Sequence, residues 1–162
     1  MTQLYDNIIS KLKKYKCEYE EFDHEPVFTS AAATNVMEHP EKQGTKSLAI
    51  EPKKGSKLAI IVVTVSGHER INFKTVTQVT GIKKLSMCSE ETIARILGTE
   101  IGGLAPFGYA TEGICLLVSK NLFEQEKVYF NPGKNNVTIC LSGTDFQKVM
   151  RAEGAKLLPS EP

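Results

Sequence analysis

Hydrophobic and polar positions along this chain follow two different periods, which predict short helices interleaved with short strands. Residues 3–16 place apolar side chains at helical spacing with lysines on the remaining positions, a pattern that predicts an amphipathic helix. Residues 58–65 are an unbroken, mostly β-branched run, typical of a strand buried on both faces. The same reasoning predicts further helices at 31–37, 72–79, 90–97 and 145–152, and further strands at 19–23, 45–51, 84–87, 114–118, 127–130 and 137–141.

Polar residues and glycines mark the ends of these elements. The predicted N-caps are Thr29 or Ser30, Asn72, Ser89, and Thr144 or Asp145. Lys53-Lys54-Gly55-Ser56 predicts a hairpin turn. Because the βα units are too irregular for a doubly wound parallel sheet, the pattern predicts an α+β fold: a mixed, largely antiparallel β-barrel or half-barrel flanked by short helices. The concave face of such a sheet is where a small ligand would bind.

Composition and charge narrow the function classes. The chain has 162 residues and a formal net charge of +1, so we expect one domain over residues 1–162, and any RNA contact has to come from local patches. Four scattered cysteines form no C-x-x-C pair, and three histidines have no metal-ligand spacing, which argues against a disulfide scaffold and a metal site. No signal peptide precedes the first helix, and no apolar run approaches the roughly 20 residues that span a bilayer. We therefore expect a soluble, cytoplasmic protein without membrane association.

The most distinctive segment joins a predicted helix to an apolar strand. Its sequence is Gly102-Gly103-Leu104-Ala105-Pro106-Phe107-Gly108. Glycine admits backbone conformations closed to other residues and lets a ligand approach main-chain N–H groups, while proline fixes one bend. Such a loop is suited to holding a carbonyl or anionic oxygen with its amides, although a cluster of this kind also serves as a plain structural turn.

Lys46, in the middle of the strand predicted at 45–51, is a second candidate. Lysine is depleted in strand interiors. On an edge strand its ammonium would extend to solvent. Alternatively, it points into the concave face and binds a phosphate, a carboxylate or a polarised carbonyl. Strand geometry places Thr45 and Ser47 on the opposite face.

Other polar residues are explained by capping. Thr29, Ser30, Ser142 and Asp145 border predicted helices, although a helix N-terminus can also bind an anion. The chain contains no G-x-S-x-G elbow, no H-E-x-x-H motif and no phosphate-binding loop. An enzyme with this sequence would therefore work without the familiar side-chain nucleophiles, and a nucleotide-binding enzyme of another class is disfavoured.

Taken in order, these motifs resemble those of the YbaK/ProX family of aminoacyl-tRNA editing domains, which are related to the insertion domain of bacterial prolyl-tRNA synthetase. The resemblance rests on Phe28-Thr29, Lys46-Ser47-Leu48, the loop Gly102 to Gly108 and the closing segment Phe130 to Phe146. It implies a mixed β-barrel flanked by helices, acting as an aminoacyl-tRNA deacylase that hydrolyses the ester between a wrong amino acid and its tRNA. The chain departs from the cysteine-specific members at Asn131-Pro132-Gly133-Lys134, where they carry a glycine- and arginine-rich turn.

The resemblance also implies roles for individual residues. Lys46 would lie near the 3′-terminal adenosine and the aminoacyl group. The ester carbonyl would be oriented by main-chain amides of Gly102, Gly103, Leu104, Ala105 and Pro106. The substrate would contact Phe28, Thr29, Ser47, Phe107, Gly108 and Ser142. A water would attack with help from the ribose hydroxyl, with no metal and no cofactor.

The implied substrate is tRNA for proline that carries a small non-cognate amino acid such as alanine, serine or cysteine. Prolyl-tRNA synthetase is a further implied partner. The alternative is a module that binds tRNA or docks on a synthetase without catalysis. Lys46 together with the intact glycine–proline loop favours the enzyme.

Overall fold

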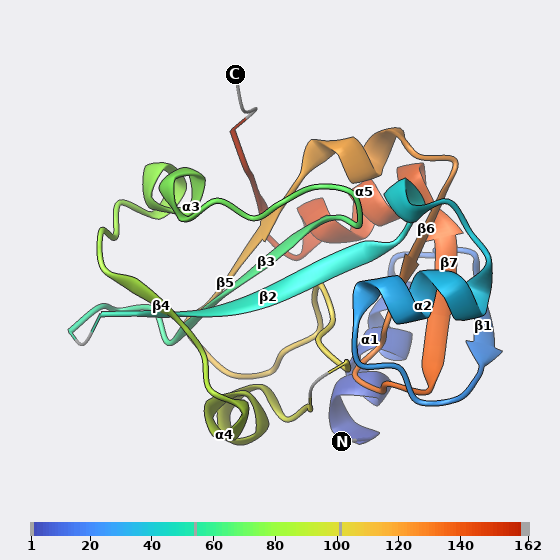
Figure 1. Cartoon of the computed structure of the whole chain (residues 1–162), viewed down its shortest axis with the longest axis horizontal. Coiled ribbons are helices and arrows are strands. Elements are labelled where there is room, and N and C mark those ends of the chain that lie inside the picture. The colour runs from blue at the N-terminus through green and yellow to red at the C-terminus, as the bar shows by residue number, and fades with distance from the viewer. Residues whose placement is uncertain (1, 54, 101, 160–162) are drawn as a thin grey trace.

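The strands of this protein form two sheets (Figure 1). The structure is a computed structural model and describes residues 2–53, 55–100 and 102–159. The smaller sheet has the strand order β1-β7-β6, and the larger one the order β4-β2-β3-β5-β8. The strands are β1 (Tyr19–Asp23), β2 (Thr45–Pro52), β3 (Ile60–Ser66), β4 (Leu85–Met87), β5 (Ile114–Val118), β6 (Lys127–Phe130), β7 (Val137–Ser142) and β8 (Lys156–Leu157).

Short helices pack on both sheets. The α-helices are α1 (Thr2–Lys14), α2 (Ser30–Met37), α3 (Phe73–Thr80), α4 (Glu90–Thr92) and α5 (Gly143–Ala152). The 3-10 helices are η1 (Glu41–Gln43) and η3 (Lys120–Glu124), and the π-helical turn η2 (Ile93–Leu97) continues α4. Within the described ranges, no helix has the length and apolar character needed to cross a membrane.

The expected α+β class and the mixed, mostly antiparallel pairing are confirmed, but the barrel is not. β2 pairs antiparallel with β3 and β4, and β7 with β1 and β6, whereas β5 pairs parallel with β3 and β8. In the described part of the chain, an isolated bridge between Gly44 and Tyr129 links the two sheets, and no closed barrel forms. The edge strands β4 and β8 have only three and two residues, too few to carry the hydrogen-bond ladder around to the smaller sheet.

β3 lies at the centre of the larger sheet, and all of its residues are buried. Its side chains alternate between two clusters, as strand geometry requires. Ile61, Val63 and Val65 pack in the cluster that contains α3, while Ile60 and Val62 pack with η2. Figure 1 shows α3 and α4 on opposite sides of β2 and β3. The predicted strand with two buried faces is therefore confirmed.

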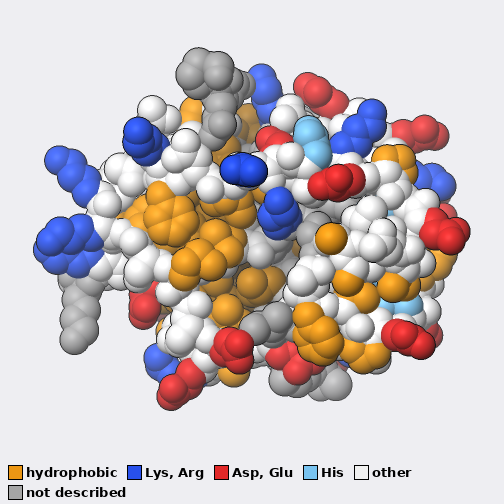
Figure 2. Space-filling model, in the orientation of Figure 1, with side chains coloured by type: hydrophobic (Ala, Val, Ile, Leu, Met, Phe, Trp, Pro, Cys, Tyr) orange, Lys and Arg blue, Asp and Glu red, His pale blue; other side chains and the backbone are white. Residues whose placement is uncertain are grey.

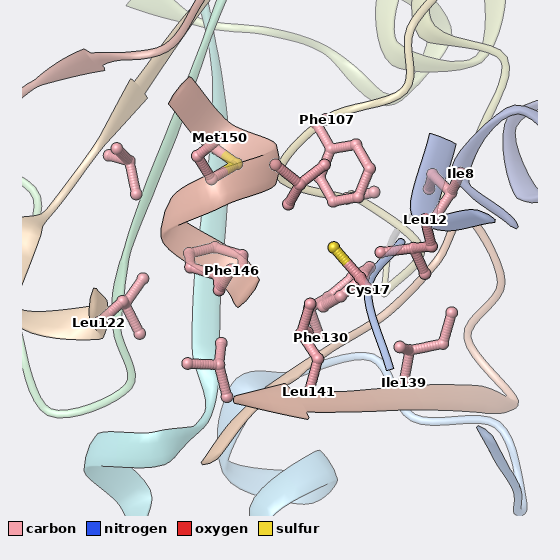
Figure 3. Close-up of a cluster of buried hydrophobic side chains, with 14 of the residues drawn as sticks. Ile8, Leu12, Cys17, Phe107, Leu122, Phe130, Ile139, Leu141, Phe146 and Met150 are labelled. Atoms are coloured by element: carbon pink, nitrogen blue, oxygen red, sulfur yellow. The ribbon is translucent and has the colours of Figure 1, made fainter. Parts of the chain in front are cut away.

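A third cluster packs α1 and α5 against the smaller sheet (Figure 3). Phe130 lies between Phe107 and Phe146, with ring centroids 5.6 and 6.3 Å away. All three side chains are buried. Tilted aromatic pairs at such distances contribute about 0.5–1.5 kcal/mol each beyond the area they bury. The three rings thus tie the segment around residue 107 to α5 and β6.

Three of the predicted helix caps are confirmed. The hydroxyl of Thr29 caps α2, and it accepts a hydrogen bond from the amide three residues on at 3.0 Å. Asn72 caps α3 and Ser89 caps α4 in the same way. The antiparallel pairing of β2 with β3 also confirms the predicted hairpin, of which Lys54 lies outside the described residues.

The predicted cap of the last helix, Thr144 or Asp145, is wrong. α5 begins at Gly143, and Ser142 Oγ accepts the hydrogen bond from the Asp145 amide at 3.0 Å. Gly143 fits closely against the carbonyl of Gln125, since a Cβ there would lie 2.1 Å from that oxygen. This tertiary contact starts the helix earlier than the local pattern predicts.

Replacing Phe146 with alanine tests the third cluster. Because the ring is fully buried, Phe146→Ala should lower the free energy of unfolding by about 3–5 kcal/mol. Urea denaturation followed by circular dichroism measures the change. As a control, Leu157 is 48% exposed, and Leu157→Ala should cost less than about 0.5 kcal/mol. A cost below about 1 kcal/mol for Phe146→Ala would contradict the packing described.

Candidate functional site

A cavity of about 290 Å³ lies along the edge of β2 that faces away from β3, and we call it the edge cavity. β4 pairs with β2 only over Ile50–Pro52, so within the described chain no strand pairs with this edge at residues 45–48. The start of α2, the start of α4 and the glycine-rich loop surround this stretch. The sequence-predicted residues that line the edge cavity are Phe28, Thr29, Lys46, Ser47, Gly102 and Leu104.

Sequence reasoning missed further residues of this lining. They are Ala33, Thr45, Leu48, Met87, Cys88, Glu90, Ile93 and Asn131. Most of them are apolar, so the cavity is lined by both apolar and polar side chains. Nothing in the local pattern of α4 or β4 predicts that their side chains meet β2. One feature of the sequence did point to Asn131: it lies in the motif that departs from the glycine- and arginine-rich turn of the cysteine-specific family members.

Gly102 is a glycine because the backbone of another segment lies against it. Its φ is +83°, and a Cβ would lie 2.1 Å from the carbonyl oxygen of Val27. Asn131 Nδ2 donates a hydrogen bond to the Gly102 carbonyl. The amide of Val27 in turn donates to the carbonyl of Asn135 at 2.7 Å. Three segments that are far apart in sequence therefore meet at the edge cavity.

Part of the loop's hydrogen-bonding capacity is already used within the protein. The Gly103 amide donates to the carbonyl of Glu100 at 2.9 Å. The Ala105 amide donates to the Tyr109 hydroxyl at 2.9 Å, and that hydroxyl donates to the Ala105 carbonyl at 2.7 Å. Pro106 has no N–H. These three positions cannot orient a substrate carbonyl through their amides in this conformation.

The amides of Gly102 and Leu104 differ from these. Neither donates a hydrogen bond to another described residue, and both residues line the edge cavity. Gly103, by contrast, is buried and does not line it. The two amides, which are two positions apart in the chain, are therefore the candidates in this loop for donating hydrogen bonds to an oxygen atom in the edge cavity.

The second half of the loop belongs to the core. Ala105, Pro106, Phe107 and Gly108 are buried, and none of them lines the edge cavity. At Gly108 a Cβ would lie 2.5 Å from Cγ1 of Ile8. These positions anchor the loop on α1 and the aromatic cluster, and the structure does not bring Phe107 or Gly108 to the edge cavity.

Lys46 lines the edge cavity, but its ammonium does not end there. Lys46 Nζ donates a hydrogen bond to the carbonyl of Glu69 at 2.7 Å, which places the charge toward the loop after β3. Ser47 lies on the opposite strand face, as predicted, and its hydroxyl is hydrogen-bonded to that of Thr64 at 2.8 Å. Neither hydroxyl is next to a base.

The remaining predicted residues divide between two places. Phe28 and Thr29 line the edge cavity, with Phe28 59% exposed and Thr29 engaged in capping α2. Ser142 lies elsewhere: it caps α5 and lines a different cavity beside Glu18 and Lys127. The structure does not bring Ser142 to the edge cavity.

Comparison with known proteins assigns the family. Residues 24–149 match the model of the aminoacyl-tRNA editing domain. The chain belongs to this family. The prolyl-tRNA editing protein ProX of Acetoanaerobium sticklandii is 28% identical over 150 residues, which cover 91% of this chain and 90% of that protein.

Solved structures share the fold of this editing domain. The crystal structure of a hypothetical protein superposes with a TM-score of 0.79 at 21% identity, and covers 93% of this chain and 96% of its own. A crystal structure whose name proposes a trans-editing enzyme for prolyl-tRNA synthetase has a TM-score of 0.76 at 18% identity, and covers 99% of each chain. At these identities the comparison shows the architecture alone.

The edge cavity of this editing domain contains no activated nucleophile among its described residues. Burial, with a smaller effect from the carboxylate of Glu51, raises the pKa of the Cys88 thiol to about 11. A protonated thiol is a poor nucleophile. No histidine lines the described cavity. Among the residues that the structure describes, no three His, Cys, Asp or Glu side chains are grouped to hold a metal ion.

The alkylation of Cys88 tests whether its thiol is activated. Because its pKa is raised from 9.0 to about 11, reaction with iodoacetamide should be slow at pH 8 and still rise up to pH 10. Mass spectrometry of the peptide that contains Cys88 measures the rate at each pH. A plateau at or below pH 9 would show a thiolate of ordinary or lowered pKa, and would return Cys88 to the candidate nucleophiles.

Proposed function

We propose that this protein, acting as a single cytoplasmic domain, hydrolyses the ester of tRNA for proline charged with alanine, serine or cysteine. The proposal rests on one observation. The main-chain N–H groups of Gly102 and Leu104 donate no hydrogen bond to another described residue, and both residues line a partly apolar cavity of an editing domain. The name of the A. sticklandii relative supports the choice of tRNA. The name of the structural neighbour supports prolyl-tRNA synthetase as the enzyme that supplies the mischarged substrate.

The reaction requires a water, a binding place for the carbonyl oxygen and a leaving group. Water adds to the ester carbonyl carbon, the bond to the ribose oxygen breaks, and that oxygen leaves with a proton. The negative charge that develops on the carbonyl oxygen is stabilised by the N–H groups of Gly102 and Leu104. One such donor typically contributes about 10²–10³ in rate.

A side-chain nucleophile is not needed for this substrate. An aminoacyl ester is already activated, so orientation and oxyanion stabilisation supply most of the acceleration. The ribose hydroxyl beside the ester assists the attacking water. This role of the substrate suits a cavity in which Ser47 is bonded to Thr64 and the thiol of Cys88 stays protonated.

The lining of the edge cavity sets which amino acids are accepted. Leu48, Ile93 and Leu104 are apolar residues of this lining, and we expect the cavity to admit small side chains and exclude large ones. An extra methylene in such a pocket changes discrimination by only about 1–3 kcal/mol, so alanine, serine and cysteine are separated weakly. Glu90, in the first turn of α4, lines the same cavity and supplies a carboxylate for the α-ammonium of the aminoacyl group.

Deacylation assays test the proposal directly. The purified protein is mixed with tRNA for proline charged separately with alanine, serine, cysteine or proline, and the remaining ester is measured over time. We expect release of at least one small amino acid and little release of proline. Binding of all four without release would instead support a non-catalytic tRNA-binding module.

Two substitutions test the assignment of the site. Lys46→Ala removes the cation beside the edge cavity, and Gly102→Ala forces a Cβ into the Val27 carbonyl. Gly102→Ala should lower kcat/KM by about 10² or more, and Lys46→Ala should lower it through the loss of a cation that helps to bind the substrate, with circular dichroism unchanged for both. Gly81→Ala is the matched control, because Gly81 also has a positive φ but open space around it. Full activity of both site variants would refute the assignment.

Asn131 is tested as a positioning residue, since it touches the Gly102 carbonyl and not the reacting atoms. Asn131→Asp keeps the shape but removes the donor, so the loop loses one hydrogen bond, worth about 1 kcal/mol. We expect kcat to fall about fivefold or more with KM nearly unchanged, and the same for Asn131→Ala. If the aspartate variant keeps the wild-type kcat, the hydrogen bond does not position the loop.

A further inference from the structure

A second cavity, of about 390 Å³, lies on the other side of Lys46, where the end of β3 meets α3 and η3. We call it the basic cavity. The polar residues that line it include Glu69, Arg70, Asn72, Ser119, Lys120 and Asn121. None of these residues lines the edge cavity.

The positive charges of the basic cavity are not neutralised within the protein. Arg70 and Lys120 are exposed, and their side chains form no hydrogen bond or ion pair with another described residue. The ion pairs of the described chain lie elsewhere, where the partly buried Lys11 of α1 meets Glu153 and the exposed Lys148 of α5 meets Asp145. The basic cavity thus has two unpaired cations to which an anionic ligand can bind.

Glu69, the one carboxylate among the described residues of this lining, is hydrogen-bonded to other parts of the protein. Glu69 Oε1 accepts a hydrogen bond from the Ser66 amide at 2.9 Å. Glu69 Oε2 accepts from the Ser119 hydroxyl and from Asn121 Nδ2, each at 3.1 Å. These bonds hold the carboxylate against the ends of β3 and η3. Three hydrogen bonds thus engage the Glu69 carboxylate within the fold, while the donors of Arg70 and Lys120 are open.

A single hydrogen bond joins a residue that lines the edge cavity to a residue that lines the basic cavity. Lys46 lines the edge cavity and donates at 2.7 Å to the carbonyl of Glu69, which lines the basic cavity. Arg70, the next residue in the chain after Glu69, lines the same basic cavity. Figure 2 shows Lys and Arg side chains gathered along the border of the apolar area between α3 and β2.

We propose that the basic cavity binds phosphate groups of the RNA strand whose 3′ end carries the ester into the edge cavity. This inference rests on the proposed function. Lys46 at the edge cavity and Arg70 and Lys120 at the basic cavity offer cations to a polyanion that runs from one cavity to the other. The chain as a whole has a net charge of only +1, so its affinity for RNA depends on such a local track. Counterions released from each neutralised phosphate supply the binding free energy.

The test compares a substrate that has this strand with one that lacks it. Alanyl-tRNA for proline carries the phosphates, whereas 3′-O-alanyl-adenosine has the ester without them. The double variant Arg70→Gln with Lys120→Gln should lower kcat/KM on the charged tRNA at least about tenfold. On alanyl-adenosine it should stay within about twofold of wild type. The slope of log kcat/KM against log salt for the tRNA should become shallower by about 1 per lost contact.

A binding measurement makes this inference independent of hydrolysis. Fluorescence titration with uncharged tRNA for proline should show a Kd about tenfold higher for the double variant. Lys13→Gln is the matched control, because Lys13 is an exposed cation on α1, remote from α3 in Figure 1. It should leave the Kd within about twofold.

The outcomes separate the two proposals. An unchanged Kd of the double variant for tRNA overturns the inference. That result is expected if the basic cavity binds a free nucleotide or a protein instead. Equal losses on tRNA and on alanyl-adenosine overturn it as well, because the residues would then act on the fold or on the edge cavity. If the wild type hydrolyses neither ester, the proposed function fails, and the tRNA titration still decides whether the basic cavity binds RNA.

Discussion

The candidate site depends on the close approach of Gly102 to the backbone of Val27. No Cβ fits between them, and the positive φ of Gly102 suits a residue without a side chain. This contact brings the glycine loop to the segment that ends in Thr29, the cap of α2. Asn131 then fixes the Gly102 carbonyl from a third segment. The walls of the edge cavity are consequently built from backbone that is held at several points before any ligand arrives.

The cavity exists because β2 is only partly paired on one side. An unpaired strand edge is normally a liability, since it can pair with another chain. Here β4 stops after pairing with residues 50–52, and α2 and the glycine loop cover the rest of the edge without adding a strand. A hollow remains between β2 and these elements. A longer β4 would complete the sheet and occupy that hollow, so the shortness of the edge strand serves the site.

Local features of the sequence predict most elements correctly. The β-branched run that becomes β3 and the caps at Thr29, Asn72 and Ser89 depend on neighbouring residues alone. One prediction, the closed barrel, is not confirmed, and another, the cap of α5, is wrong, both where distant parts of the chain decide. Barrel closure requires the edges of two sheets to meet, and the start of α5 depends on how Gly143 fits against η3. Neither condition is contained in a short window of sequence.

The sequence by itself determined the family, the α+β class, and the two motifs of the site: the strand lysine and the glycine–proline loop. The tertiary structure alone decided which parts of those motifs face the edge cavity. Consecutive residues of an irregular loop point in different directions, and partners from distant segments determine which amides stay available. Tyr109 and Glu100 occupy two of the loop's amides, the aromatic cluster takes Phe107, and the Glu69 carbonyl holds the charge of Lys46. The loop amides that stay available at the edge cavity, and to which we assign the chemistry in our proposal, are those of Gly102 and Leu104, and only contacts formed on folding make that selection.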